Sequence, residues 1–455
     1  MSSPRPTAGT PQVPEATPAE TPAYGFPAGL WRALDKRRPP FPSPRSWRSP
    51  LRGPWLTSVF GAVLLVLLPI VVVTGLLSYS AYAPQLGQGL PADAGWLRLP
   101  YFNWPTNPSW LYRLTEGLHV VLGLVLIPLV LAKLWSVVPR LFTWPPAGSI
   151  AQVLERITLL MLVGGILFEI ATGVLNMQYD YVFGFSFYDA HYYGAWVFIA
   201  GFVSHVAIKL PLMIRSLSSR SLRTELRTSL DETRPEPPDP DGLVATDPSQ
   251  PTVSRRGALA LVGGGSLMVA VLSAGQTIGG FTRSFAVLLP RGRDNGDGPN
   301  DFPINRTAAA AKITPGVAGS SWRLTLATDA QEIILDREAL LGMTQHTAVL
   351  PIACVEGWSS TQTWTGVRLR DLAALAGVQS PTSAQVTSLE ESGSFNQAAL
   401  QSNQVLDPDS LLALQVNGVD LSPDHGFPAR IIVPAMPGVH NTKWVRSITF
   451  NGGLT

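Results

Sequence analysis

Four long apolar stretches limit what this chain can fold into more than any other feature of its sequence. They run over residues 56–79, 114–138, 157–176 and 193–214, and a fifth, richer in Gly, Ala and Val, covers 257–280. A helix that crosses the hydrocarbon core of a membrane needs about 20 apolar residues. Only 14% of the residues are charged, against roughly 25% in a typical soluble domain. We therefore expect a membrane α-helical bundle of four helices plus a fifth anchoring helix.

The distribution of Arg and Lys predicts how these helices are oriented. Cations gather before the first stretch, in the loop that contains Arg140 and Arg156, and after the fourth stretch, whereas the other two loops contain few. By the positive-inside rule, the N-terminus lies in the cytoplasm. Five crossings then place residues 281–455 outside. We expect residues 1–54 to form a disordered cytoplasmic tail, 55–215 the four-helix domain and 216–253 a polar cytoplasmic linker.

The fifth stretch begins with Ser254 and two arginines, Arg255 and Arg256. Paired arginines before a mildly apolar, Gly-rich segment resemble the twin-arginine export signal, although Ala258 stands where that signal usually has Phe. The alternative is a pair of cytoplasmic cations beside an ordinary helix. The resemblance implies that residues 254–280 use the twin-arginine machinery, in addition to the Sec machinery for the earlier helices. It places the protein in a bacterial cytoplasmic membrane, with a C-terminal domain exported in folded form.

Charge and cysteine count exclude several classes of function. The formal net charge is +2 and the cations form separate clusters, so nucleic acid is not an expected partner. The chain contains a single cysteine, Cys354. One cysteine excludes an internal disulfide, a CxxC zinc site and a CxxCH haem site. Cys354 is therefore a buried small apolar residue, a nucleophile or a single thiolate ligand of a metal.

Residues 281–455 differ in pattern from the membrane part. Alternating apolar and polar residues at 321–328, 346–355 and 429–435 predict strands, and the segments 368–377 and 407–418 predict short helices or helix and turn pieces. A segment of about 170 residues is long enough for one packed domain. We expect an α+β domain here.

Four motifs in this domain resemble the molybdopterin-binding domain of the sulfite oxidase family. They are, in chain order, DFPINRTA (301–308), CVEGWS with WTGVRLRDL (354–372), NGVDLSPDHGFPARIIVP (417–434) and PGVHNTKWVRSITF (437–450). The resemblance implies a molybdenum-cofactor oxidoreductase that acts on a small molecule by oxo transfer. It also implies that Cys354 is the protein ligand of molybdenum, because a soft thiolate suits such a metal. A buried structural cysteine is the alternative.

The pterin carries a phosphate or nucleotide, so its pocket needs cations, amide groups and glycines that allow close approach. The resemblance assigns these contacts to Asn305, Arg306, His425, Arg430 and Lys443, and Gly426 and Gly438 fit the need for close backbone approach. His440 and Asn441 stand where relatives often have a Gly and a basic residue. The sulfite-binding arginines of the family have no match here, and no immunoglobulin-like dimerisation domain is expected. The arrangement is more similar to exported bacterial molybdoenzymes that reduce sulfoxides with electrons from a membrane partner.

Three of the six histidines, His119, His191 and His205, lie in or beside the apolar stretches. Histidines on facing helices are typical of b-type cytochromes. At about 1.5 Å per residue, His119 and His191 lie roughly 21 Å and 27 Å from the cytoplasmic face, and His205 roughly 6 Å. His119 and His191 are thus close in depth and could hold one haem b. A second haem at His205 would need a different axial partner, because Lys133 stands where a second histidine would be needed. A plain membrane anchor is the alternative.

Two further features of the membrane part are unusual. Glu169 lies in the middle of an apolar stretch, where a carboxylate is costly, and could relay protons, contact a quinone or simply bond a neighbouring helix. The segments TGLLSYSAY (74–82) and TGVLNMQYDY (172–181) indicate an internal duplication. We expect a membrane oxidoreductase that exchanges electrons with the quinone pool. The alternative is a non-catalytic tethered module that keeps the sulfite oxidase fold.

Overall fold

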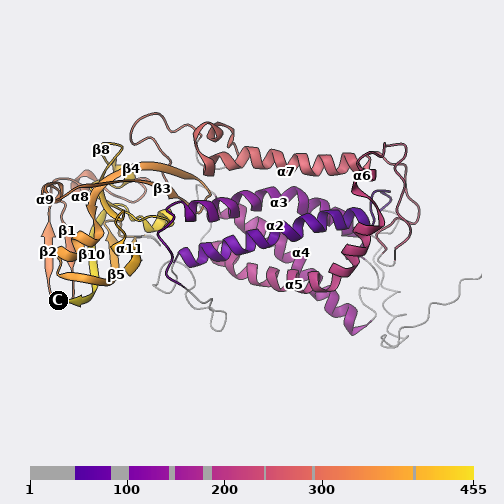
Figure 1. Ribbon diagram of the computed structural model, residues 1–455, viewed down its shortest axis with the longest axis horizontal. Coiled ribbons are helices and arrows are strands. Elements are labelled where there is room, and N and C mark those ends of the chain that lie inside the picture. Colours follow the sequence, from indigo (N-terminus) through magenta and orange to yellow (C-terminus); the bar gives the residue numbers. More distant parts are fainter. Residues whose placement is uncertain are drawn as a thin grey trace, which may run out of the picture.

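The computed structural model describes residues 47–82, 102–142, 149–177, 187–239, 242–288, 293–392 and 396–454. A helical bundle lies at one end of the molecule and a sheet-rich domain at the other (Figure 1). Most of the tail predicted for residues 1–54 lies outside the described residues. The boundaries predicted between domains remain predictions, but the division into an apolar helical part and a sheet-rich part is confirmed.

Five helices form the bundle: α2 (Pro54–Ala81), α3 (Leu111–Leu141), α4 (Ile150–Asn176), α5 (Phe187–Ser219) and α7 (Arg255–Ile278). All five are long and apolar enough to cross a membrane, as the sequence predicts. Helix α7 lies alongside α3 on the outside of the other four (Figure 1). The side chain of Ser254 caps its start by accepting a hydrogen bond from the amide of Gly257 at 3.1 Å.

Small residues set the close approach of α4 to α5. A Cβ atom at Gly165 would lie 2.9 Å from the backbone of Phe198, and one at Gly201 would lie 2.7 Å from the amide nitrogen of Leu162. Glycines at such contacts let two helix backbones approach within van der Waals distance, which drives helix association where no water is present. These two glycines therefore hold α4 and α5 together as one pair.

The linker between α5 and α7 packs on the end of the bundle that is far from the sheet-rich domain, with α6 (Leu222–Glu225) in it (Figure 1). The carboxylate of Glu236 accepts a hydrogen bond from the amide of Trp55 at 2.9 Å. Arg255, the first arginine of the pair, is buried, and its guanidinium lies 3.3 Å from the Glu225 carboxylate. The linker is polar, as predicted, but it docks on the start of α2 through these contacts.

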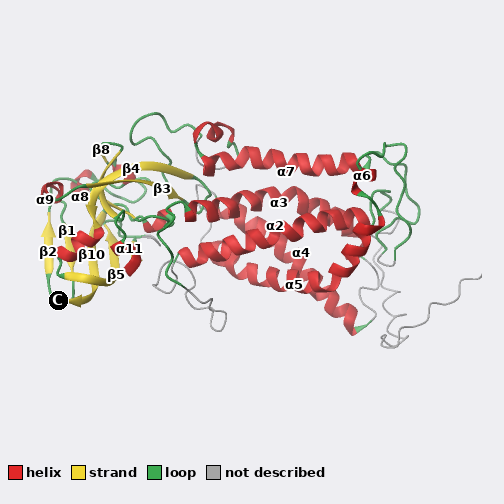
Figure 2. Cartoon of the chain, viewed as in Figure 1, coloured by secondary structure: helices red, strands yellow, loops and turns green. Residues whose placement is uncertain are grey.

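The sheet-rich domain contains two five-stranded sheets (Figure 2). The first has the order β2-β1-β10-β5-β6, and the second has the order β3-β4-β7-β8 with β9 also paired to β7. The strands are β1 (Leu324–Ala327), β2 (Glu332–Leu335), β3 (His346–Ala353), β4 (Ser359–Arg368), β5 (Val378–Ser388), β6 (Gln397–Gln401), β7 (Leu411–Val416), β8 (Val419–Asp420), β9 (Arg430–Ile432) and β10 (Val445–Leu454).

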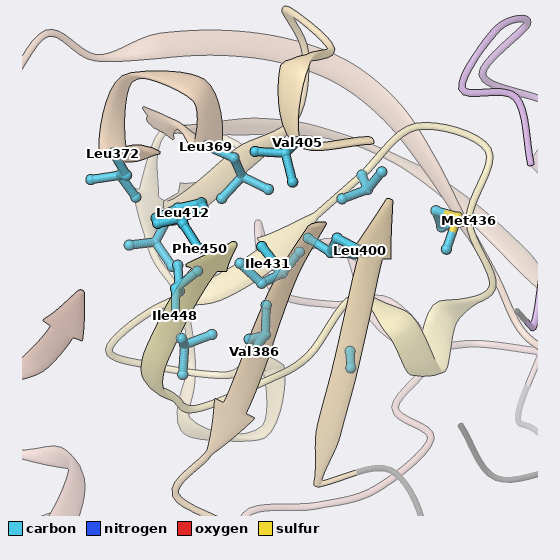
Figure 3. Packing of buried hydrophobic residues seen from close by; sticks show 14 of the residues in the cluster. Leu369, Leu372, Val386, Leu400, Val405, Leu412, Ile431, Met436, Ile448 and Phe450 are labelled. Atoms are coloured by element: carbon cyan, nitrogen blue, oxygen red, sulfur yellow. The ribbon is translucent and has the colours of Figure 1, made fainter. Parts of the chain in front are cut away.

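Short helices connect and cover these sheets. They are α8 (Pro315–Ala318), α9 (Arg337–Gly342), α10 (Leu369–Leu375) and α11 (Ser402–Leu406), with 3₁₀ turns at Pro423–His425 and Gly438–His440. The main core lies between the two sheets and these helices. Val386, Leu400, Ile448 and Phe450 come from the first sheet, Leu412 and Ile431 from the second, and Leu369, Leu372 and Val405 from helices (Figure 3).

The strands predicted at 321–328, 346–355 and 429–435 and the helix predicted at 368–377 are confirmed. The helix predicted within 407–418 is wrong, because strand β7 lies there between two turns. Leu411, Leu412, Ala413 and Leu414 are all fully buried. A strand covered on both faces has a continuous apolar run instead of alternation, and such a run does not distinguish a strand from a buried helix.

Candidate functional site

Cys354 lies in the turn between β3 and β4. The amide of Gly357 donates to the Cys354 carbonyl at 2.9 Å, and the Cys354 amide donates to the Trp358 carbonyl at 3.0 Å. Gly357 has a φ of +87°, a conformation that glycine adopts at low cost. The turn therefore fixes the direction of the cysteine side chain, which is 4% exposed.

A small pocket lies beside Cys354, with an empty volume of about 290 Å³ when its open side is included; we call it the cysteine pocket. Six of the residues predicted for the cofactor line it, from four separate segments of the chain: Asn305, Cys354, His425, Arg430, Gly438 and Lys443. A Cβ atom at Gly438 would lie 2.9 Å from the carbonyl of Ala353. Glycine at this position therefore lets two segments of the pocket wall meet.

Two of the predicted residues, Gly426 and Arg306, do not line the cysteine pocket. Gly426 packs behind the wall, since a Cβ atom there would lie 3.1 Å from both Arg430 and Lys443. Arg306 is paired with Glu390 instead. Its guanidinium Nε lies 2.6 Å from the Glu390 carboxylate, and the side chain is 44% exposed. Its backbone carbonyl instead accepts a hydrogen bond from Lys443 Nζ at 2.6 Å. Arg306 thus contributes to the site by holding Lys443.

His425 and Arg430 are locked in the wall by contacts with the protein. The His425 ring stacks on Phe302 with 3.6 Å between centroids, and its Nε2 lies 2.8 Å from the Asn300 carbonyl. The Arg430 guanidinium donates to the carbonyls of His425 and Asn441, both at 3.1 Å. Burial lowers the pKa of Arg430 to about 9. Burial, together with the charges of Arg430 and Lys443, lowers the pKa of His425 to about 3, so this ring is neutral at physiological pH.

A run of buried polar atoms without partners borders the same wall. Among the described residues, no hydrogen bond reaches Arg430 Nε, either ring nitrogen of His440, Asn441 Nδ2 or Thr442 Oγ1. More than nine in ten buried polar groups in proteins are hydrogen-bonded. Arg430 lines the cysteine pocket, and residues 440–442 lie in the chain between Gly438 and Lys443, which also line it. Unused polar atoms at this wall fit a ligand rich in oxygen and negative charge, as the phosphate end of a pterin cofactor is. The sequence did not single out Thr442, although it adjoins Lys443.

The charge of Lys443 depends on whether an anion is bound beside it. Its Nζ also donates to the Asp424 carbonyl at 2.9 Å. Burial, and then the nearby Arg430 charge, lowers its pKa to about 7. A bound phosphate would favour the charged form and raise this pKa.

We expect the affinity of the cofactor-free protein for its pterin phosphate to fall as the pH rises above about 7. Above that pH, binding requires Lys443 to take up a proton, so the dissociation constant should rise by up to about tenfold per pH unit. Equilibrium dialysis between pH 6 and 9, with the retained pterin measured by fluorescence, gives the slope. Lys443→Arg should flatten it, and an unchanged slope in that variant would assign the pH dependence to another group.

The second cluster of predicted residues lies in the bundle, where α3 and α5 bring His119 and His191 together. Their ring centroids are 6.0 Å apart and their planes are at 87°. His119 Nδ1 lies 2.9 Å from the Val71 carbonyl, and His191 Nδ1 lies 3.0 Å from Thr172 Oγ1. The closeness of the two rings is as predicted from depth. Because each Nδ1 is engaged with the protein, each Nε2 remains for a ligand.

The separation of 6.0 Å between the ring centroids is compatible with one metal atom held by both imidazoles. An imidazole nitrogen lies about 2 Å from a bound transition metal, and two rings on opposite sides then have centroids about 6 Å apart. Gly75 and Gly173 make room for the rings, since Cβ atoms there would lie 2.8 Å from His119 and 3.3 Å from His191. These glycines belong to the two TG segments, so each segment places a glycine beside a histidine of the neighbouring helix.

The cavity around these rings, which we call the histidine-pair cavity, has an empty volume of about 1290 Å³ with its open side included. Two carboxylates line it: Glu169, with Oε2 at 3.2 Å from His191 Nδ1, and Glu116, which accepts a hydrogen bond from Ser78 at 2.7 Å. Glu116 was missed because it lies at the end of an apolar stretch. His205 lines a different cavity.

The two sites meet where the bundle contacts the sheet-rich domain. Val355, the neighbour of Cys354, lines the histidine-pair cavity. A Cβ atom at Gly357 would lie 2.8 Å from Val120 of α3, and Thr277 Oγ1 of α7 donates to the Gly357 carbonyl at 2.6 Å. The cysteine turn is thus packed against two helices of the bundle.

A tryptophan from the loop between α2 and α3 strengthens this contact. Trp104 is 1% exposed, and its indole nitrogen donates to the Ala435 carbonyl at 2.7 Å. Its backbone amide donates to the side chain of Gln401 at 3.0 Å, and its carbonyl accepts from Asn403 at 2.8 Å. Burying a large aromatic with all its polar groups satisfied is typical of a fixed interface.

Comparisons with known proteins match the C-terminal domain. Residues 311–452 match the family model described as oxidoreductase molybdopterin binding domain. The uncharacterized oxidoreductase YuiH of Bacillus subtilis is 34% identical over 119 residues, which cover 26% of this chain and 59% of that protein. The NADH nitrate reductase of Volvox carteri is 39% identical over 103 residues, which cover 20% of this chain and 12% of that protein. The mitochondrial sulfite oxidase of Homo sapiens is 35% identical over 114 residues, which cover 24% of this chain and 21% of that protein.

The chain spans less than two thirds of the length of each of these relatives. The matches confirm the predicted molybdopterin-binding domain and its oxidoreductase class. The family model begins after α7 and covers none of the five apolar helices. The roles of individual residues, and haem in the bundle, remain predictions.

Proposed function

We propose that this chain is a membrane-anchored molybdenum-cofactor oxidoreductase that works by oxo transfer on the outer side of a bacterial cytoplasmic membrane. In this proposal it exchanges electrons with the membrane quinone pool through one haem b held by His119 and His191. The bound molybdenum cofactor supplies the two-electron oxo transfer, and the haem supplies one-electron steps. The substrate is a small molecule that gives or takes an oxygen atom.

One observation supports this proposal above all: Cys354 lines the cysteine pocket, and the residue that follows it, Val355, lines the histidine-pair cavity. Electrons would therefore pass between two cofactors held by one chain, without a mobile carrier. The packing of Gly357 on Val120 and the buried Trp104 support a fixed distance between the two sites.

The protein groups have separate tasks in this proposal. Cys354 would ligate molybdenum as a thiolate, which metal binding would keep deprotonated. Arg430, Lys443 and the unused donors of residues 440–442 hold the phosphate end of the pterin, and His425 stays neutral and orients the wall. In the bundle, the Val71 carbonyl and Thr172 fix the two imidazole rings.

The arrangement of the chain also supports the proposed topology. The sheet-rich domain lies at the end of the bundle where α2 and α4 end, and the linker with α6 lies at the opposite end (Figure 1). Arg140, Arg156 and the cations after α5 belong to that opposite end, which the positive-inside rule assigns to the cytoplasm. Export of the domain through the twin-arginine machinery would allow the cofactor to be inserted before translocation.

Metal analysis and a dithionite-reduced absorption spectrum of the whole protein, purified from membranes in detergent, test the proposal. We expect about one molybdenum and one b-type haem per chain. Protein without molybdenum, from cells that make the cofactor, would contradict the enzyme and favour a tethered binding module. Molybdenum without a b-haem spectrum would contradict the electron route and reduce the bundle to an anchor.

A further inference from the structure

A second cavity occupies the half of the bundle that is far from the sheet-rich domain; we call it the inner cavity. It lies among α2, α3, α4 and α5 and has an empty volume of about 1460 Å³, its open side included. Leucine, valine, isoleucine and phenylalanine side chains form most of its wall. The polar and charged side chains that reach it include His205, Lys133, Arg140, Glu155 and Lys209.

Most of these charged groups already have partners in the protein. Lys133 Nζ donates to the Thr57 carbonyl at 2.7 Å. The Glu155 carboxylate lies 3.0 Å from Lys209 Nζ and 2.5 Å from the Arg140 guanidinium. His205 differs from them, because no described residue forms a hydrogen bond with its ring. A polar ring left without a partner in an apolar cavity is available to a ligand.

The inner cavity adjoins the histidine-pair cavity. Leu68, Ile166 and Phe198 line both, and these three apolar side chains form the partition between them. A ligand in the inner cavity would therefore be the next redox group after a haem at His119 and His191.

We infer that the inner cavity binds the ring of a membrane quinone or quinol. The apolar walls suit the ring and its isoprenoid tail. His205 provides a ring nitrogen for one ring oxygen, and Lys133, whose ammonium has three N–H donors and uses one on the Thr57 carbonyl, can donate to the other. This inference rests on the proposed function and assigns a binding site to the quinone of that proposal. A second haem would need another strong axial ligand, and the facing cation Lys133 is bonded to the Thr57 carbonyl. An anionic lipid would need free cations, whereas Arg140 and Lys209 are paired with Glu155.

The protons and electrons of a bound quinol can all be accounted for at this site. Oxidation of a bound quinol breaks its two O–H bonds and releases two protons and two electrons. One proton goes to the unpartnered ring nitrogen of His205 and the other to water at the cytoplasmic mouth. The electrons leave one at a time across the partition to the histidine-pair cavity. Reduction of a quinone follows the same route backwards.

The first test measures haem reduction in the whole protein in lipid nanodiscs, by dithionite and by a short-chain quinol. His205→Phe fills the cavity and removes the proton acceptor, so the quinol-driven rate should fall at least about tenfold while dithionite still reduces the haem. Val203→Phe is the matched control, since Val203 is 59% exposed on the same helix and does not line the cavity. His205→Gln, which keeps a polar side chain of similar size, should give an intermediate rate. An unchanged quinol rate in His205→Phe would overturn the inference.

The second test does not depend on haem. A photoreactive azidoquinone, irradiated with the wild-type protein, should label peptides within residues 198–213, and His205→Phe should abolish this labelling. Labelling elsewhere that is insensitive to His205, or two haems per chain by pyridine haemochromogen assay, would overturn the inference. If the wild-type protein contains no haem, the proposed electron route fails, but the labelling still decides whether the inner cavity holds a quinone.

Discussion

Replacing Cys354 with serine is expected to lower substrate turnover by at least about 100-fold when electrons come from a soluble artificial donor. Loss of groups that merely orient a metal ligand costs about 10–100-fold, and this change removes the ligand itself. The side chain is 4% exposed in a turn held by backbone hydrogen bonds, so the near-isosteric serine should leave the fold intact. X-ray absorption at the molybdenum edge should show one sulfur neighbour fewer than in the wild type.

Ser360→Ala is the control for this substitution. It removes a hydroxyl on β4 that accepts a hydrogen bond from Gln362 at 2.6 Å and lies outside the cysteine pocket. It should change neither turnover nor the number of sulfur neighbours. If Cys354→Ser keeps the wild-type sulfur count, the thiol is a structural residue and the ligand assignment is wrong.

Replacing His191 with leucine is expected to reduce the haem content of the purified protein to a tenth or less. The two rings are 6.0 Å apart, so one leucine removes one of the two groups that would hold the iron, and His119→Leu should have the same effect. Molybdenum content and turnover with a soluble donor should persist, because the cysteine pocket is untouched. Turnover with quinol should be lost. This pattern separates loss of the electron route from general misfolding.

His205→Leu is the matched control, since it is the same substitution on the same helix in the other cavity. It should keep the haem, as measured by the dithionite-reduced spectrum. Haem lost from His205→Leu but kept in His191→Leu would place the haem in the inner cavity and contradict the assignment to His119 and His191.

Much of the architecture follows from local sequence signals. The five apolar stretches determine α2 to α5 and α7, because length and hydropathy suffice for a helix that must satisfy its own backbone in lipid. The rise per residue of an α-helix was enough to predict that His119 and His191 lie at similar depth. The four motifs placed Cys354, His425, Arg430 and Lys443 together because a family pattern carries long-range information that periodicity lacks.

Other features depend on contacts that no local pattern contains. Strand β7 was mistaken for a helix because its buried run Leu411–Leu414 lacks alternation. Arg306 was expected in the cofactor pocket, but Glu390, far along the chain, holds its side chain outside. The docking of Trp104 and the packing of Gly357 on Val120 arise from the way two domains meet, and neither segment reveals this alone.

The position of β10 has a consequence for how the protein is made. This strand lies in the middle of its sheet, parallel to β1 and antiparallel to β5, yet it is the last strand of the described chain to leave the ribosome. At about 5–20 residues per second, synthesis reaches it on the order of 10 s or more after α5 emerges. Under the proposed topology, α2 to α5 would already be in the bilayer while the domain waits for its central strand. If α7 crossed the membrane early, the sheet would be exported without its central strand. The time at which this one Gly-rich helix crosses therefore decides whether the domain is exported fully folded.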